Sequence, residues 1–143
     1  MTLTTPSPSR APAVATVDRL SLPLPSGPEA PSLARRATAG FLHRFWPSLA
    51  QSRCDDFLLI VSELVTNAVR HAPGRSTLTL TIASSVLDIA VTDCSCVLPA
   101  SRPPDLRDGT GGMGLHIAED LGARLFTEAL PDGKRVHAAF AAA

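Results

Sequence analysis

The chain lacks an excess of either charge, which limits the partners that it can be expected to bind. Its 143 residues include 13 lysines and arginines and 13 aspartates and glutamates, so the formal net charge is zero. Domains that bind nucleic acids usually show a clear basic excess. Direct binding to DNA or RNA is therefore not expected.

Long apolar runs and targeting signals are lacking as well. No segment approaches the roughly 20 apolar residues that a membrane-spanning helix needs. The N-terminus has no basic stretch followed by an apolar core, which is the pattern of a signal peptide. We expect a cytoplasmic protein that has no membrane partner.

Cysteines are few, and their spacing excludes two kinds of site. Cys54, Cys94 and Cys96 are an odd number and form no C-x-x-C pair, which argues against a disulfide framework. Cys94 and Cys96 also lack the second Cys or His pair that a metal site of this type needs. Small buried thiols are the simplest interpretation.

Hydrophobic residues make up 45% of the chain, which is enough for the core of one domain. Residues 1–15 are rich in Thr, Ser, Pro and Ala and are expected to form a disordered tail. We therefore expect a single folded domain over residues 16–143.

Apolar periodicity and the positions of proline and glycine predict the order of the elements. Strands are expected at residues 16–24, 77–83, 86–92, 124–129 and 134–140, and helices at residues 29–46, 55–72 and 115–121. Hairpin turns are expected at residues 84–85 and 131–133, a connector at 48–53 and a long loop at 97–109. This order favours an α+β fold, with helices on one face of a mixed, mostly antiparallel sheet.

The predicted helix over residues 55–72 carries a row of polar side chains. Its apolar residues recur at spacings of three and four, and they are Phe57, Leu58, Val61, Leu64, Val65, Ala68, Val69 and Ala72. Glu63, Asn67 and His71 are spaced four apart and should line the opposite side. A carboxylate, an amide and an imidazole in a row can serve one ligand, but a solvated surface has the same pattern.

Two later segments could serve the same ligand. Asp93 stands where a predicted strand ends, and a carboxylate there can bind a ligand or simply cap a turn. Four glycines precede the last predicted helix, at positions where backbone N–H groups can approach an anion or where the chain is merely flexible. They are Gly109, Gly111, Gly112 and Gly114. The phosphate-binding spacing G-x-x-x-x-G-K-[ST] is absent.

These segments occur in the order that one family shows. Residues 63–72 (ELVTNAVRHA) resemble the N box of the histidine-kinase-type ATPases, whose Bergerat fold is shared with gyrase and Hsp90. Residues 91–93 (VTD) and 112–115 (GMGL) resemble the first and second glycine boxes. The resemblance is to the small bacterial anti-sigma-factor serine kinases in particular. It covers about residues 20–140 and implies a two-layer α/β sandwich that binds ATP.

The resemblance also implies roles for individual residues. Asn67 would ligate the Mg²⁺ that bridges the ATP phosphates, because an amide oxygen suits a hard cation. Glu63 would take the proton of the attacking serine hydroxyl, or orient that hydroxyl. Asp93 would accept a hydrogen bond from the adenine amino group and so select ATP over GTP. The segment at the phosphates would be Gly112, Met113, Gly114 and Leu115.

Two positions depart from the family pattern. Cys94-Ser95-Cys96-Val97 follows Asp93, where the first glycine box usually continues with glycines. Some members carry a basic residue just before the second box that reaches a phosphate, and Arg107 is the nearest basic residue in this chain. The second departure matters for rate, because phosphoryl transfer depends strongly on cations around the phosphates.

The resemblance implies an ATP-dependent protein-serine kinase that phosphorylates an anti-sigma-factor antagonist, with a sigma factor and a second copy of the chain as further partners. The alternative is a non-catalytic switch, in which ATP orders residues 97–109 and exposes or hides a protein-binding surface. The ATP domain of a two-component histidine kinase is less favoured, because the chain shows no separate dimerising phospho-acceptor domain.

Overall fold

An antiparallel sheet forms one layer of the molecule. The computed structural model describes residues 16–72, 74–94 and 118–141. Within them the strands follow the spatial order β1-β2-β3-β5-β4, and each of the four pairings is antiparallel. The strands are β1 (Val17–Leu24), β2 (Ser76–Ala83), β3 (Val86–Asp93), β4 (Arg124–Leu130) and β5 (Gly133–Ala141).

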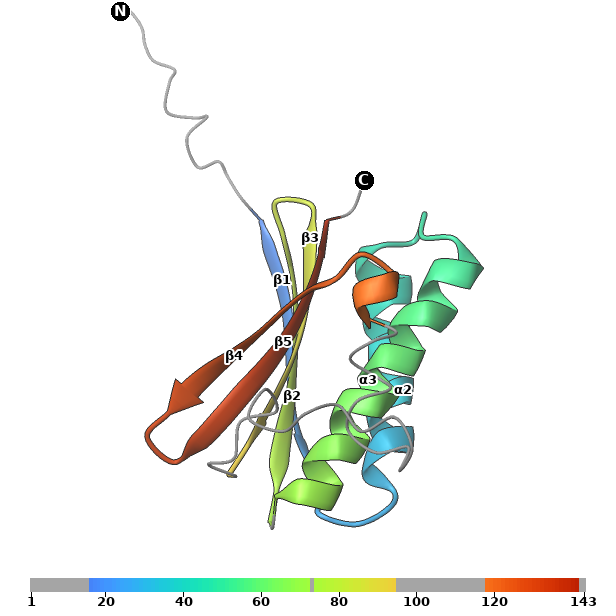
Figure 1. Cartoon of the computed structure of the whole chain (residues 1–143). Coiled ribbons are helices and arrows are strands. Elements are labelled where there is room, and N and C mark those ends of the chain that lie inside the picture. Colours follow the sequence, from blue (N-terminus) through green and yellow to red (C-terminus); the bar gives the residue numbers. More distant parts are fainter. Residues whose placement is uncertain (1–15, 73, 95–117, 142–143) are drawn as a thin grey trace, which may run out of the picture.

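Two helices form the second layer. The helices α2 (Ala30–Phe45) and α3 (Gln51–His71) lie side by side on one face of the sheet. Figure 1 shows the opposite face free of helices in the described part of the chain. The predicted α+β class, with helices on one face, is confirmed. None of the described helices is long and apolar enough to cross a membrane.

Among the described residues the predicted elements agree closely with the observed ones, with one clear exception; the predicted tail at 1–15, the loop at 97–109 and residues 115–117 of the last predicted helix lie outside them. Helix α3 begins at residue 51 rather than 55, so the predicted connector over residues 48–53 is half helical. The side chain of Gln51 donates a hydrogen bond of 2.8 Å to Asp55, four residues later, which supports the added turn. No glycine or proline lies between Pro47 and this turn to prevent the helix from starting early.

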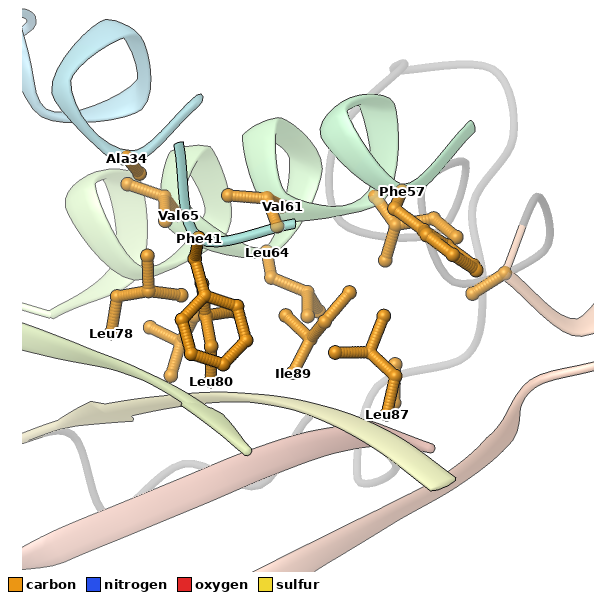
Figure 2. Packing of buried hydrophobic residues seen from close by; sticks show 14 of the residues in the cluster. Ala34, Phe41, Phe57, Val61, Leu64, Val65, Leu78, Leu80, Leu87 and Ile89 are labelled. Atoms are coloured by element: carbon orange, nitrogen blue, oxygen red, sulfur yellow. The ribbon is translucent and has the colours of Figure 1, made fainter. Parts of the chain in front are cut away.

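The core fills the space between the helices and the sheet, as Figure 2 shows. Phe57, Val61 and Val65 of α3 are fully buried against apolar side chains from the central strands. The strand residues that face them are Leu78, Leu80, Leu87, Ile89 and Val91. Burying one such side chain stabilises the fold by roughly 1.5–3 kcal/mol. The apolar face predicted for this helix is therefore the face that binds it to the sheet.

Two turns depend on left-handed backbone. Ser84 and Ser85 join β2 to β3 with φ angles of 51° and 63°, the conformation of a type I′ hairpin turn. Gly122 has a φ of 92° after a helical segment at residues 118–120. The N–H groups of Gly122 and Ala123 donate to the carbonyls of Glu119 and Ala118, which forms a Schellman cap. Gly122 therefore ends this helical segment.

Candidate functional site

The polar row predicted on the central helix lies along a flank of α3, beside the buried Ile60, rather than on the side opposite the core as predicted. Glu63 and Asn67 are half-buried, whereas His71 is exposed. Leu64 and Ala68, one residue after each of the first two, are buried. Glu63 and Asn67 are thus held by a helix that is fixed on its apolar side, while their own side chains remain within reach of a ligand.

The C-terminal half of α3 and the end of β3 lie at the same end of the sheet (Figure 1). At the opposite end, the rings of Phe57 and Phe140 lie 4.8 Å apart between centroids. From Phe57 to Asn67 the helix advances by about 15 Å. From Phe140 back to Lys134, strand β5 covers roughly 20 Å towards the same end of the sheet. Asn67 and Lys134 therefore both lie towards the end of the molecule opposite this aromatic contact.

Asp93 is the last residue of β3, as predicted. The residues two and four before it, Val91 and Ile89, are buried against the helices. Because side chains alternate along a strand, Asp93 points to the same face. Its carboxylate is buried and is directly opposite Lys134 in the register of β3 and β5.

Lys134 forms a buried ion pair with Asp93 that the sequence did not predict. Its Nζ donates hydrogen bonds to both carboxylate oxygens of Asp93, at 2.9 Å to Oδ1 and 3.0 Å to Oδ2. The side chains are only 6% and 4% exposed, so neither charge is satisfied by bulk water. A carboxylate has about four lone-pair positions, so contact with the ammonium does not by itself prevent a further hydrogen bond to a ligand.

Gly133 lets the turn before β5 approach β3 closely. A Cβ at this position would overlap the carbonyl oxygen of Asp93. The absence of a side chain therefore permits the register that places Lys134 beside Asp93. The sequence contained two signals for this arrangement: a Pro-Asp-Gly turn and the only lysine of the chain directly after it.

A hollow of about 310 Å³ opens at this end of the sheet. Asp93 lines it together with Thr77, Thr92 and Gly133, but neither Glu63 nor Asn67 does. The two threonines face the side of the sheet that carries no helix, because they alternate with buried residues on their strands. This hollow is therefore distinct from the space between α3 and β3.

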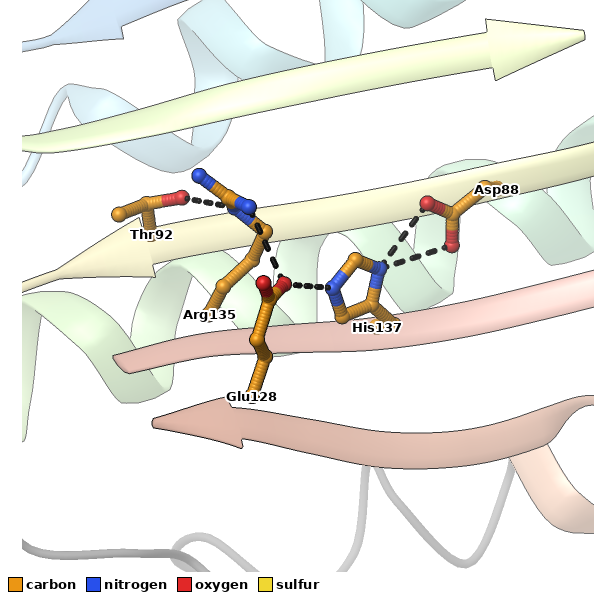
Figure 3. A network of polar contacts seen from close by, with 5 residues as sticks. All are labelled: Asp88, Thr92, Glu128, Arg135 and His137. Atoms are coloured by element: carbon orange, nitrogen blue, oxygen red, sulfur yellow. Dashed lines mark hydrogen bonds and ion pairs between the residues drawn. The ribbon is translucent and has the colours of Figure 1, made fainter. Parts of the chain in front are cut away.

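A polar network on the helix-free face holds the last hairpin against β3 (Figure 3). The imidazole of His137 lies between two carboxylates, with Nδ1 3.0 Å from Asp88 and Nε2 3.1 Å from Glu128. Arg135 bonds both Glu128 and Thr92. The hydrogen bond from His137, with help from the charge of Arg135, lowers the pKa of the Glu128 carboxyl.

The network and the buried ion pair lie on opposite faces of the same strand. Arg135 and His137 alternate along β5 with Lys134, which faces the helices. Contacts on the helix-free face therefore hold β5 in place, and the helix-facing side of this strand carries the ammonium of Lys134. The sequence alone indicates no role for His137, since the pairing of β5 with both β3 and β4 is not visible in local patterns.

Several predicted site residues lie outside the described part of the chain. They are Gly112, Met113, Gly114, Leu115 and the neighbouring Arg107. The roles predicted for them, and those predicted for Glu63, Asn67 and Asp93, stay predictions. In the described residues, no group of three or more His, Cys, Asp or Glu side chains could hold a metal ion.

Comparison with known proteins identifies the family. The model of the histidine kinase-like ATPase domain matches residues 24–140. The chain belongs to this family of ATP-binding domains. It is 32% identical over 120 residues to the serine-protein kinase RsbW of Listeria monocytogenes, an alignment that covers 73% of this chain and 75% of that protein. This match groups it with the anti-sigma-factor serine kinases, and the predicted resemblance is confirmed.

A solved structure supports the fold. The crystal structure of the RsbU and RsbW domains of Rv1364c from Mycobacterium tuberculosis superposes with a TM-score of 0.61 over 85% of this chain. At 20% identity this likeness concerns the fold alone, and the chain spans 32% of that longer protein.

Proposed function

We propose that the protein is an ATP-dependent protein-serine kinase of the cytoplasm that phosphorylates an anti-sigma-factor antagonist. The observation that supports this proposal is that Glu63 and Asn67 lie one turn apart on α3 and are half-buried, while Asp93 ends β3 at the same end of the sheet as the C-terminal half of this helix. Membership of the family supports ATP as the phosphoryl donor.

The proposed roles follow from the chemistry of the three side chains. Glu63 accepts the proton of the serine hydroxyl, or orients that hydroxyl towards the γ-phosphate. The amide oxygen of Asn67 suits Mg²⁺, which commonly takes one or two protein ligands and completes its shell with water and phosphate oxygens. When bound, this ion neutralises charge on the phosphates. Asp93 accepts a hydrogen bond from the adenine amino group.

A radiolabelled phosphate-transfer assay tests the proposal. The full chain is incubated with γ-labelled ATP, Mg²⁺ and candidate antagonist proteins, each paired with a version whose acceptor serine is replaced by alanine. Label should appear only on a serine-containing antagonist. Glu63→Gln should reduce the rate by about 10²-fold or more, as expected for loss of a general base. Glu119→Gln, an exposed carboxylate elsewhere, serves as the matched control.

The second candidate function is a nucleotide-gated binding switch without kinase activity. It is favoured by Cys94-Ser95-Cys96-Val97 after Asp93, where the family usually has glycines. The same assay separates the two functions. A partner that is captured only in the presence of ATP, and that never acquires label, identifies a switch. Equal transfer by the wild-type chain and by Glu63→Gln would contradict the assignment of Glu63 as the base.

A further inference from the structure

The buried pair of Asp93 and Lys134 has a consequence for recognition of the nucleotide base. We propose that Lys134 is a second base-reading residue, whose ammonium donates a hydrogen bond to N1 of adenine while Asp93 accepts one from the amino group at position 6. This inference rests on the proposed binding of ATP at Asp93. It makes Lys134 a determinant of base specificity.

The first step is the placement of the ammonium. Lys134 is directly opposite Asp93 in the register, and both point to the face of the sheet that carries the helices. Nζ lies almost equally far from the two carboxylate oxygens, at 2.9 and 3.0 Å. A group that approaches the outer side of either oxygen therefore meets the ammonium immediately beside it.

The second step is the number of donors. An ammonium carries three N–H groups, and the two contacts with Asp93, which point in nearly the same direction, leave at least one of them for another acceptor. With the side chain 6% exposed, a bound base would also remove the remaining water from this donor. A buried charged donor needs an acceptor, because leaving it without one is strongly unfavourable. A ligand that brings an acceptor next to its own donor satisfies this requirement.

The third step is the pattern on the base. Adenine presents an amino donor at position 6 and, next to it, an acceptor at N1. Carboxylate and ammonium side by side are the complement of this pair. Guanine in the same pose would set its carbonyl oxygen against the carboxylate and its N1–H against the ammonium, so both contacts would become repulsive. Two positions of the base are thus read instead of one.

The position of Nζ between the carboxylate oxygens also disfavours a second pose of guanine, in which its N1–H and 2-amino group both donate to Asp93. A carboxylate can grip two parallel N–H donors with its two oxygens. In this chain the ammonium occupies the fork between those oxygens. The N1–H and 2-amino group of guanine would have to displace it, which would leave Lys134 buried without its counter-ion.

Calorimetric titration of the full chain with Mg²⁺ and nucleotide analogues tests the proposal without any mutation. The ligands are ATP, 1-deazaadenosine triphosphate, which lacks N1, and purine riboside triphosphate, which lacks the amino group. Loss of a hydrogen bond to a charged donor should weaken the 1-deaza analogue about tenfold relative to ATP. Equal affinity for ATP and the 1-deaza analogue would overturn the inference.

Two variants show whether the effect belongs to Lys134. In Lys134→Met, ATP and the 1-deaza analogue should bind equally, while purine riboside triphosphate should still bind more weakly than ATP. Lys134→Gln retains an amide donor and should recover part of the preference for N1. Tighter ATP binding by Lys134→Met than by the wild-type chain would mean that the lysine obstructs the base, which overturns the inference.

Failure of this inference is distinguishable from failure of the proposed kinase function. Nucleotide binding without phosphate transfer would contradict the proposed kinase activity, but it would not affect the inference that Lys134 donates to N1 of adenine. Phosphate transfer from ATP, together with equal affinity for the 1-deaza analogue, would defeat the inference alone. A wild-type chain that binds no nucleotide would defeat both.

Discussion

Phe57 of α3 and Phe140 of β5 pack with their ring planes inclined at 56° and their centroids 4.8 Å apart. Both side chains are almost completely buried, and Arg53 covers the ring of Phe57 at 4.9 Å. The contact joins the first half of the long helix to the last strand. It closes the end of the core opposite the pair of Asp93 and Lys134.

The first prediction concerns this contact. Phe140→Ala should lower the free energy of unfolding by about 3–5 kcal/mol, because it leaves a cavity and removes an aromatic pair. Phe126→Ala provides the control, since Phe126 is 42% exposed on the helix-free face. Urea denaturation followed by circular dichroism measures both. A loss for Phe140→Ala no larger than that of the control would show that the two layers are not held together there.

The second prediction concerns the buried ion pair without nucleotide. Lys134→Met leaves the Asp93 carboxylate in a buried site without this ammonium and should lower stability by about 3–5 kcal/mol. The double variant Asp93→Asn/Lys134→Met removes both charges, so it should be more stable than Lys134→Met alone. Thermal unfolding of the two single variants and the double variant gives the coupling energy.

The matched control for this cycle is the pair of Arg135 and Glu128 on the other face of β5. Its side chains are 36% and 48% exposed, in contrast to the buried pair. Exposed ion pairs contribute little to stability, because water and salt screen the two charges. Glu128→Gln should therefore lower stability much less than Lys134→Met does at neutral pH. Additive losses in the Asp93 and Lys134 cycle would argue that the two residues do not interact.

The third prediction concerns the hairpin between β2 and β3. Ser84 and Ser85 both adopt left-handed backbone, which non-glycine residues reach at an expense of roughly 1–2 kcal/mol each. Asn-Gly is the sequence that this turn type prefers. The double substitution Ser84→Asn/Ser85→Gly should raise the free energy of unfolding by about 1 kcal/mol, and with it the midpoint of thermal unfolding. Ser84→Ala/Ser85→Ala is the control and should lower it.

The sequence was informative where structure depends on nearby residues. Apolar spacing predicted α3 and the stacking of Glu63 and Asn67 on it, and the Pro-Asp-Gly turn marked the last hairpin. The sequence did not predict contacts between residues that lie far apart along the chain. Asp93 and Lys134 are 41 positions apart, and only the pairing of β3 with β5 brings them together. Local patterns carry no information about which strands pair across such a separation.

The fourth prediction concerns acid stability and Glu128. The hydrogen bond from His137 lowers the pKa of this carboxyl below its ordinary value of 4.5 in the folded chain. A lowered folded-state pKa means that the unfolded chain binds the proton more readily. The stabilisation from Glu128 is therefore complete above pH 4.5 and is lost as the pH falls through the lowered pKa.

His137→Phe tests this linkage, because it removes the hydrogen bond but retains an aromatic ring to stack on Phe126, whose centroid lies 4.3 Å from that of the imidazole. Between pH 5 and 3, the unfolding midpoint of this variant should fall less steeply than that of the wild-type chain. Glu128→Gln should reproduce the shallower profile, since it removes the titrating group itself. Unchanged steepness in both variants would contradict the assignment of this acid sensitivity to Glu128.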